Sequence, residues 1–368
     1  MFKRKQKKTP LIFGQNRPNW FRRHKKLAII FSVAAVVVIG GGVATAFYFV
    51  NQKPAKETPE KVVMKPTPAP EAPKFYSAMT GTLVTDEATT KQAVTAIMIE
   101  NSPDARPQSG LKNSGVVFEA IAEGGITRFL ALYQQEKPAL VGPVRSVRMY
   151  YVDWLAAFNA SVAHVGGSAA ALAEVRSGGY RDIDQFFNSG SYYRASDRYA
   201  PHNVYTSFQR LDALNNAKGY ASSTFTGFAR KDSVAATAPT ATSINMIVSS
   251  ALYNPSYVYN ASTNTYDRSE AGVPHLDRES GQISPRVVIA LSVTETTIFE
   301  DGYRESIDAI GTGKATIFQD GTVQEVTWTK ASKTDQIAFT DAAGAVVPLA
   351  RGQTWITATP QTGGVSWQ

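Results

Sequence analysis

Three neighbouring runs decide the fold class of this chain: VVFEAIAEGGITRFLALYQ (116–134), VGPVRSVRMYYVDWL (141–155) and SVAHVGGS (161–168). Apolar segments at 116–121, 126–133 and 161–165 alternate in them with short, charged corners, a pattern that predicts strands. Glu123-Gly124-Gly125 predicts a hairpin turn between the first two strands, because glycine accepts a positive φ without steric cost.

Helical signals surround these strands. Tyr150, Trp154 and Phe158 recur every four residues, which predicts a helix over 146–158 with one apolar face. Ser168 and Ser207 are placed to cap helices over 169–176 and 208–217, and Gly219 is placed to end the second. With a further buried strand at 93–99, residues 75–228 are expected to form an α/β (or α+β) domain.

The second half of the chain differs in composition and in its pattern of apolar residues. Residues 229–243 (ARKDSVAATAPTATS) are small and polar, which predicts a linker. Residues 244–360 are expected to form a mainly antiparallel β domain, with Asp320-Gly321 as a tight turn between two alternating strands. Residues 361–368 are expected to be a polar tail.

The N-terminus indicates a membrane anchor. Residues 1–26 hold ten Lys and Arg and no acid, and 27–50 (LAIIFSVAAVVVIGGGVATAFYFV) carry no charge. Twenty-four uncharged, mostly apolar residues are long enough for a transmembrane helix, and the basic flank predicts a cytoplasmic N-terminus with the remaining chain outside. A cleaved signal peptide is the alternative, since Ala44-Thr45-Ala46 resembles a cleavage site. Residues 51–74 contain six prolines and predict an extended stalk.

Charge and cysteine content exclude several functions. The net charge is +8, but outside the basic tail the chain has 28 basic and 30 acidic residues, so the expected domains lack the basic excess of a nucleic-acid-binding protein. The chain has no cysteine, which excludes disulfides, thiolate catalysis and a lipidated cysteine.

Two carboxylates are candidate catalytic groups. Glu119 and Glu123 could act as an acid and base pair of the kind that cleaves glycans, or each could pair with a nearby arginine. Arg145 and Arg148 could bind a carboxylate or phosphate, or they could neutralise these same glutamates. Arg128, at the neighbouring corner, is a further ligand-binding candidate.

Histidine and tyrosine mark two other candidate positions. His164 ends a strand and could act as a base towards Ser168, although a hydrogen-bonded structural histidine is the alternative. The aromatic, polar loop around residues 192–205 could stack on and hydrogen-bond a polysaccharide, or could be pinned by its own side chains. Its ligand-binding candidates are Tyr193, Arg194, His202 and Asn203.

No metal site or cofactor is expected. Asp267, His275 and Asp277 lack a further ligand at a recognisable spacing. Gly311-Thr312-Gly313-Lys314-Ala315 lacks the glycine spacing and the hydroxyl residue of a phosphate-binding loop, and it leads into a strand.

Several segments together resemble the YerB-like bacterial lipoprotein family, which is defined by paired N- and C-terminal domains of uncharacterised function. They are ARPQSGL (105–111), EGGITRFLALYQ (123–134), VGPVRSVR (141–148), HVGGS (164–168), YAPHNVYTS (199–207), PHLDRESGQIS (274–284), GTGKATIFQDG (311–321) and GQTWI (352–356). The resemblance implies a cell-envelope location and a two-domain division, but no reaction. Members are commonly anchored through a lipidated cysteine, which this chain replaces with its expected membrane helix.

Two functions remain open. The first is a membrane-anchored envelope protein that binds peptidoglycan, another surface polysaccharide or an envelope protein partner. The second is a glycan-cleaving envelope hydrolase that uses Glu119 or Glu123, supported by Arg145, Arg148 and His164. The state of the two glutamates discriminates between them, because catalysis needs at least one of them in an open cleft.

Overall fold

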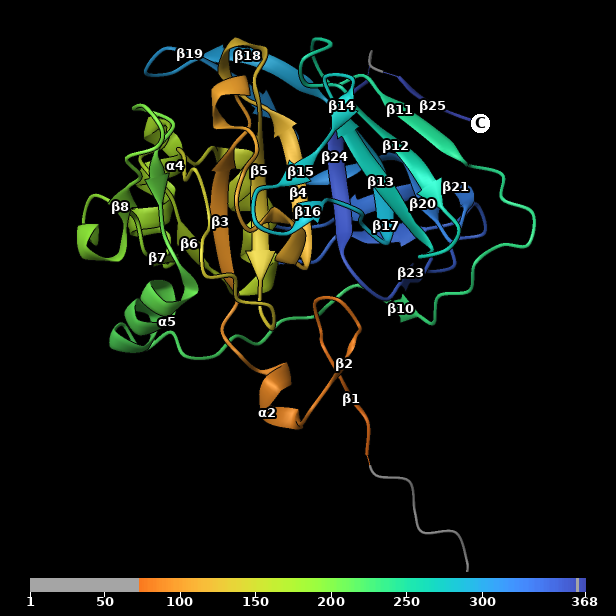
Figure 1. Cartoon of the computed structure of the whole chain (residues 1–368), viewed down its shortest axis with the longest axis horizontal. Coiled ribbons are helices and arrows are strands. Elements are labelled where there is room, and N and C mark those ends of the chain that lie inside the picture. The colour runs from red at the N-terminus through yellow and green to blue at the C-terminus, as the bar shows by residue number, and fades with distance from the viewer. Residues whose placement is uncertain (1–72, 362–363) are drawn as a thin grey trace, which may run out of the picture. The chain divides into compact units, whose positions relative to one another are not determined.

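A ten-stranded mixed sheet runs through both halves of the chain (Figure 1). Its spatial order is β22-β21-β20-β17-β24-β4-β5-β3-β6-β7. The strands are β3 (Thr95–Glu100), β4 (Val116–Ile121), β5 (Thr127–Tyr133), β6 (Ser161–Ala163), β7 (Arg181–Asp182), β17 (Val287–Val293), β20 (Gly311–Gln319), β21 (Thr322–Lys330), β22 (Ala338–Thr340) and β24 (Thr354–Pro360).

The computed structural model describes residues 73–361 and 364–368, which belong to one compact unit. Within the described ranges no helix has the length and apolarity needed to cross a membrane. The basic tail at 1–26, the expected membrane helix at 27–50 and nearly all of the expected stalk lie outside these ranges.

Strand β24 joins the two halves. It pairs in parallel with β17 on one side and with β4 on the other, where Thr354 lies opposite Val116 and Thr357 opposite Glu119. Six of its seven residues are buried, as expected for a strand with parallel neighbours and both faces covered. Figure 1 shows β24 beside β4, although the two are far apart in sequence. The sheet is therefore continuous across the expected linker.

The expected linker itself contributes one short strand. Arg230 and Lys231 form β10 (Arg230–Lys231), which pairs in parallel with β23 (Leu349–Ala350). The division of the chain into two domains at 229–243 stays a prediction. Strands from both sides of this segment build the same ten-stranded sheet.

The hairpin at Glu123 forms as predicted. β4 and β5 pair antiparallel from Val116–Leu132 to Ile121–Thr127, and Gly124 and Gly125 take φ values of 69° and 73°. A short 3-10 helix, η4 (Glu123–Gly125), makes the turn. In the second half, Asp320 and Gly321 turn between β20 and β21 with φ values of 57° and 77°.

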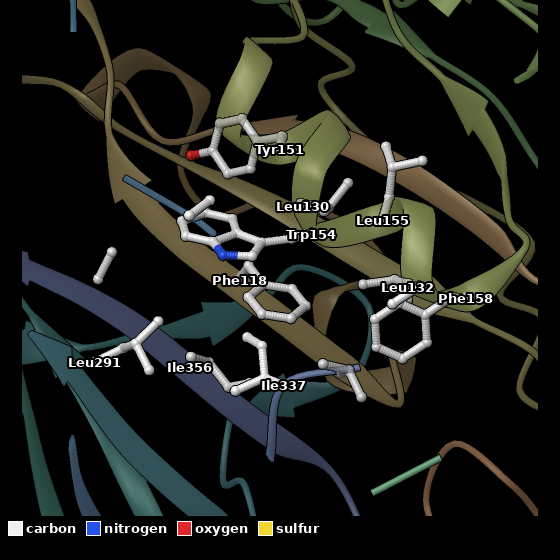
Figure 2. Packing of buried hydrophobic residues seen from close by; sticks show 14 of the residues in the cluster. Phe118, Leu130, Leu132, Tyr151, Trp154, Leu155, Phe158, Leu291, Ile337 and Ile356 are labelled. Carbon is white, nitrogen blue, oxygen red and sulfur yellow. The ribbon is translucent and has the colours of Figure 1, made fainter. Parts of the chain in front are cut away.

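Helices cover one face of the sheet. α3 (Met149–Leu155) begins three residues later than predicted, because Val147 is still extended and bridges Gly167, and it continues as the 3-10 helix η5 (Ala156–Phe158). α4 (Ala169–Ser177) packs beside it, with Ser168 at the N-cap position but without a side-chain capping bond. In Figure 2, Trp154 lies against Phe118 of β4, and the two rings stack at 5.1 Å.

The opposite face has two covers. In the first half, α5 (Phe208–Ala217) packs there through Phe208 and Leu211, and Ser207 caps it by accepting from the Arg210 amide. In the second half, a five-stranded antiparallel sheet packs on β17 and β20. Its order is β14-β13-β12-β11-β25, with β11 (Ser243–Met246), β12 (Pro255–Asn260), β13 (Thr265–Glu270), β14 (Val273–Pro274) and β25 (Val365–Trp367).

The last strand corrects the expected polar tail. Residues 365–367 pair with β11, and Trp367 packs edge-on against Phe318 at 5.7 Å. Three residues with one large aromatic are enough here because the edge of the sheet offers unpaired amides and carbonyls.

Short elements complete the unit. They are β1 (Phe75–Tyr76), β2 (Leu83–Val84), α2 (Glu87–Thr90), η2 (Pro103–Ala105), η3 (Leu111–Asn113), η6 (Ser189–Ser191), β8 (Tyr193–Arg194), β9 (Val204–Tyr205), β15 (Leu276–Asp277), β16 (Gly281–Gln282), β18 (Glu295–Phe299) and β19 (Tyr303–Ile307).

Truncating an aromatic side chain in this stacked core should lower the unfolding free energy substantially. Trp154→Ala removes a buried indole from between α3 and β4, and we expect unfolding free energy to fall by about 3–5 kcal/mol in a denaturant titration. Tyr199→Ala is the control, because Tyr199 is 92% exposed, and should change it by less than about 0.5 kcal/mol. Similar losses for the two variants would contradict this packing.

Candidate functional site

Glu119 is buried inside the molecule and fully engaged. It lies on β4, on the face covered by the five-stranded sheet, and its Oε1 accepts from Arg268 Nη2 at 3.0 Å. Its Oε2 accepts from the indole of Trp355 at 3.0 Å and the hydroxyl of Thr357 at 3.3 Å. A carboxylate with these partners and no exposed surface has no open side towards a substrate.

Arg268 is the centre of this buried network. Besides Glu119, it donates from Nε to His275 Nδ1 at 2.8 Å and from Nη1 to the Tyr257 hydroxyl at 2.9 Å. Its guanidinium also lies 4.7 Å from the ring centre of Trp355. Burial by itself would lower the pKa of Arg268, but Glu119 and the other acidic neighbours outweigh it and raise the pKa, so the side chain stays charged.

Glu270 and His275 complete the network. Glu270 Oε1 accepts from Asn101 Nδ2 at 2.6 Å and lies 3.3 Å from Arg106 Nη2. Burial raises the pKa of Glu270 to about 7, against the opposing charge of Arg268. Burial likewise lowers the pKa of His275 well below its usual value, so the ring is neutral and donates from Nε2 to Gln108 at 2.9 Å. Charges and hydrogen bonds thus connect both halves of the chain.

Glu123 lies in a separate cluster of arginines. Arg148 donates to both of its oxygens, with Nη2–Oε2 at 2.5 Å, while Arg128 Nη2 and Arg304 Nε lie 3.9 and 3.7 Å away. Burial would raise the pKa of Glu123, but Arg148 and then Arg128 outweigh it and lower the pKa. An ionised carboxylate held between cations is a poor general acid at neutral pH. Glu119 and Glu123 share none of these partners, so the contacts do not bring them together as a catalytic pair.

Arg145 belongs to a third cluster, at the carboxyl end of β3. Its Nε lies 3.4 Å from Glu100 Oε1, which also accepts from His202 Nδ1 at 2.9 Å and from Ser102 at 3.1 Å. Because Nδ1 donates to Glu100, neutral His202 has a free electron pair on Nε2. That atom lies 3.9 Å from Asp104, whose side chain is mostly exposed.

His202 also lines a pocket of about 620 Å³. Its wall combines aromatic, charged and hydrogen-bonding groups from both halves of the chain: Asp104, Pro107, Asp197, Arg198, Tyr199, Ala200, His202 and Arg278. Arg278 pairs with Asp197, so the loop before β16 closes one side of the pocket. A larger pocket of about 720 Å³, lined by 224–229 and 334–339 among others, contains none of the sequence-predicted site residues.

The other predicted residues of this loop hold its shape. Asn203 is buried, accepts from Arg194 Nη1 at 2.7 Å and donates to the carbonyls of Ala195 and Arg198. Tyr193 is stacked by Arg210 at 5.4 Å. The loop is therefore pinned by its own side chains, while Tyr199 and His202 remain at the pocket.

His164 has no bond to Ser168. Its Nδ1 contacts the Gly166 carbonyl at 2.7 Å, and its Nε2 lies 3.2 Å from Asp182 Oδ1. Ser168 is buried at the start of α4, so these contacts do not assemble a base and a nucleophile.

The three second-half residues considered for a metal point to different protein partners. His275 bonds Arg268 and Gln108, Asp277 accepts from the amides of Glu279 and Ser280, and Asp267 accepts from Ser284 and Asn260. Gly311–Ala315 forms the start of strand β20.

Sequence reasoning missed Glu100, Arg268 and Glu270. The signal for the last two is the alternation in TYDRSE (265–270), where buried positions carry Tyr266, Arg268 and Glu270. Opposite charges on the inward face of an amphipathic strand indicate a buried ion network. Glu100 ends a wholly buried strand, which is the position where sheets present functional groups.

The buried ion pair predicts that replacing one partner lowers the unfolding free energy more than replacing both. Arg268→Met leaves Glu119 buried without its cation, and we expect it to lower the unfolding free energy by about 3–5 kcal/mol in denaturant titration. Adding Glu119→Gln should recover part of that loss, because the unpaired charge disappears. Lys137→Met, which breaks a partly exposed pair with Asp212, should cost less than about 1 kcal/mol. A double variant no more stable than Arg268→Met would contradict the coupling.

Comparison with known proteins agrees with this architecture. Residues 79–221 match the model for "Protein of unknown function (DUF3048) N-terminal domain", and residues 244–356 match its C-terminal counterpart. The protein named "Putative lipoprotein YerB" of Bacillus subtilis (strain 168) is 34% identical over 298 residues, covering 78% of this chain and 87% of that protein. The crystal structure of YerB protein from Bacillus subtilis superposes with a TM-score of 0.70 at 30% identity, covering 80% of this chain and all of that one. The chain therefore belongs to the YerB-like family of paired DUF3048 domains.

Proposed function

We propose that this chain is a membrane-anchored, extracytoplasmic envelope protein that binds a cell-wall polysaccharide in the pocket beside Tyr199 and His202. Peptidoglycan is the first candidate for this polysaccharide. The observation that carries the proposal is the exposed ring of Tyr199 on the wall of that pocket. Tyrosine faces stack on sugar rings, and neighbouring Asp, Arg and His side chains supply the hydrogen bonds that orient a polar ligand.

Two observations support the proposed extracytoplasmic location. The relative from Bacillus subtilis is named as a lipoprotein, and this chain carries a basic segment followed by 24 uncharged residues before its folded part. A helix over 27–50 would anchor the chain from the cytoplasmic side and leave the pocket outside. An envelope protein partner is the alternative occupant of the same pocket.

The mixed charge of the pocket favours a polar, nearly neutral ligand over a polyanion. Arg198 and Arg278 are matched by Asp104 and Asp197, and Arg278 is already paired with Asp197. A surface that bound a polyanion would be expected to present unmatched cations.

One observation favours hydrolysis as a second candidate. His202 is held by the buried carboxylate of Glu100 through Nδ1, which leaves Nε2 at the pocket side as an acceptor. A histidine oriented by a carboxylate can take a proton from water in general-base catalysis. In this second candidate function the general base is His202, and not Glu119 or Glu123, which are enclosed by ion pairs.

Pelleting with insoluble peptidoglycan tests the binding proposal. The full-length chain in detergent should sediment with the glycan, and Tyr199→Ala should weaken retention about tenfold, the equivalent of losing one stacking contact of about 1.4 kcal/mol. Tyr303→Ala is the matched control, because Tyr303 is also exposed but lies on β19, away from the pocket. Absence of retention, or equal losses in the two variants, would contradict polysaccharide binding at this pocket.

The supernatant of the same assay tests the second candidate. If the chain hydrolyses the glycan, fragments with new reducing ends should appear, and His202→Gln should abolish their release. Release that persists in His202→Gln and disappears in Glu123→Gln would return the chemistry to Glu123. Retention without release would leave binding as the function.

A further inference from the structure

A second cluster of ligand-type side chains lies at the carboxyl ends of neighbouring parallel strands. β6 and β7 pair in parallel with Val162 opposite Asp182, and the ladder continues through Gln185 N to His164 O at 2.9 Å. His164 and Asp184 therefore face each other just beyond the strands, and Asp182 ends β7 two residues before Asp184. The carboxyl edge of parallel strands is where open α/β sheets place their ligands.

The three side chains converge. One ligand atom each from His164, Asp182 and Asp184 lies within 4.8 Å of the other two. His164 and Asp184 are fully buried, and the Asp182 side chain is 19% exposed, which leaves a route from solvent. Convergence of acidic groups alone is common on proteins, so the hydrogen bonding within the cluster decides what it can hold.

The hydrogen bonds of His164 leave one contact unexplained. The Gly166 carbonyl can only accept, so at 2.7 Å it takes the proton of Nδ1. In a neutral ring, Nε2 then presents an electron pair to Asp182 Oδ1 at 3.2 Å, where two acceptors face each other. A second ring proton or a bound cation is needed at this contact. Metal-bound histidines in proteins typically donate their other ring N–H to a carbonyl in this way.

Asp184 provides an independent observation. Its Oδ1 accepts from the Phe187 amide at 3.0 Å, but its buried Oδ2 has no hydrogen-bond partner. The cation nearest to that oxygen is Arg176 Nη2 at 3.8 Å, beyond hydrogen-bonding distance. The Arg176 side chain is 43% exposed and stacks on Phe187 at 5.2 Å, so it can withdraw towards solvent without breaking the core.

We propose that His164 Nε2 and the carboxylates of Asp182 and Asp184 bind a divalent first-row transition metal ion, of which Zn²⁺ is the best fit. One imidazole nitrogen with two carboxylates is a donor set that zinc accepts, and three protein ligands leave a fourth position for water or another ligand. The cation occupies the contact between Nε2 and Asp182 and satisfies Asp184 Oδ2. The Gly166 carbonyl accepts from Nδ1 and so fixes the orientation of the His164 ring.

Metal titration of the full-length chain tests this site. The protein is purified in detergent without a histidine tag, stripped with a chelator and titrated with Zn²⁺ by calorimetry, and with Co²⁺ by visible absorption. We expect one equivalent to bind with micromolar or tighter affinity, and Asp184→Asn to weaken it at least tenfold. Asp212→Asn, an aspartate paired with Lys137, is the matched control and should bind like the unaltered chain.

A second readout keeps the test decisive if Asp184→Asn fails to fold. The ¹⁵N shift of His164 Nε2 reports whether that atom carries a proton, and it should change to that of a metal-bound nitrogen when Zn²⁺ is added. A protonated Nε2 at saturating Zn²⁺ would overturn the proposal in favour of a buried ion pair. So would the absence of saturable binding of Zn²⁺ and Co²⁺, or equal affinities for Asp184→Asn and Asp212→Asn.

Discussion

The ion pair between Glu119 and Arg268 constrains the whole arrangement. Two charges with no exposed surface are tolerable only when each is paired and hydrogen-bonded, because removing them from water costs several kcal/mol per ion. Glu119 comes from the central sheet, and Arg268 comes from the five-stranded sheet that covers it. The pair is satisfied only when both halves of the chain are folded and in register, with Trp355 and Thr357 of β24 donating to the same carboxylate.

Strand β24 makes that register possible, and it also determines where the pocket lies. Its parallel pairing with β4 places the second half of the chain against the first along a buried edge. The loop that carries Arg278 then reaches Asp197, so the pocket beside Tyr199 has walls from both halves. Neither matched domain alone would supply this pocket. The cluster at His164, in contrast, is built from the first half only.

Local patterns in the sequence predicted the local structure well. The Glu123 hairpin, the Ser207 cap and the Asp320-Gly321 turn depend on residues within a few positions of each other, and each forms. The pairing of β24 with β4 depends on residues more than two hundred positions apart, and alternation of apolar residues carries no information about that partner. A polar composition also concealed β25, because three residues are too few for a pattern.

Sequence separation also determines which contacts of the candidate site can be predicted. Glu123 and Arg148 are close in sequence, and their pairing is one of the two interpretations that the sequence allows. Glu119 bonds an arginine 149 positions away, so its burial was not visible. His202 lies in the aromatic, polar loop that the sequence singles out, but its partner Glu100 lies 102 positions earlier. Asp182 ends a two-residue strand that is too short to recognise, and Asp184 lies just beyond it, which hid the cluster around His164.

We infer that the two matched domains fold as one cooperative unit through β24 and the Glu119–Arg268 pair. Native-state amide hydrogen exchange of the full-length chain over a denaturant series measures it most directly. We expect the most protected amides of β5, from the first half, and of β20, from the second, to open with the same free energy and the same denaturant dependence. Separate opening of one half, at a clearly lower free energy and with a smaller denaturant dependence, would contradict it.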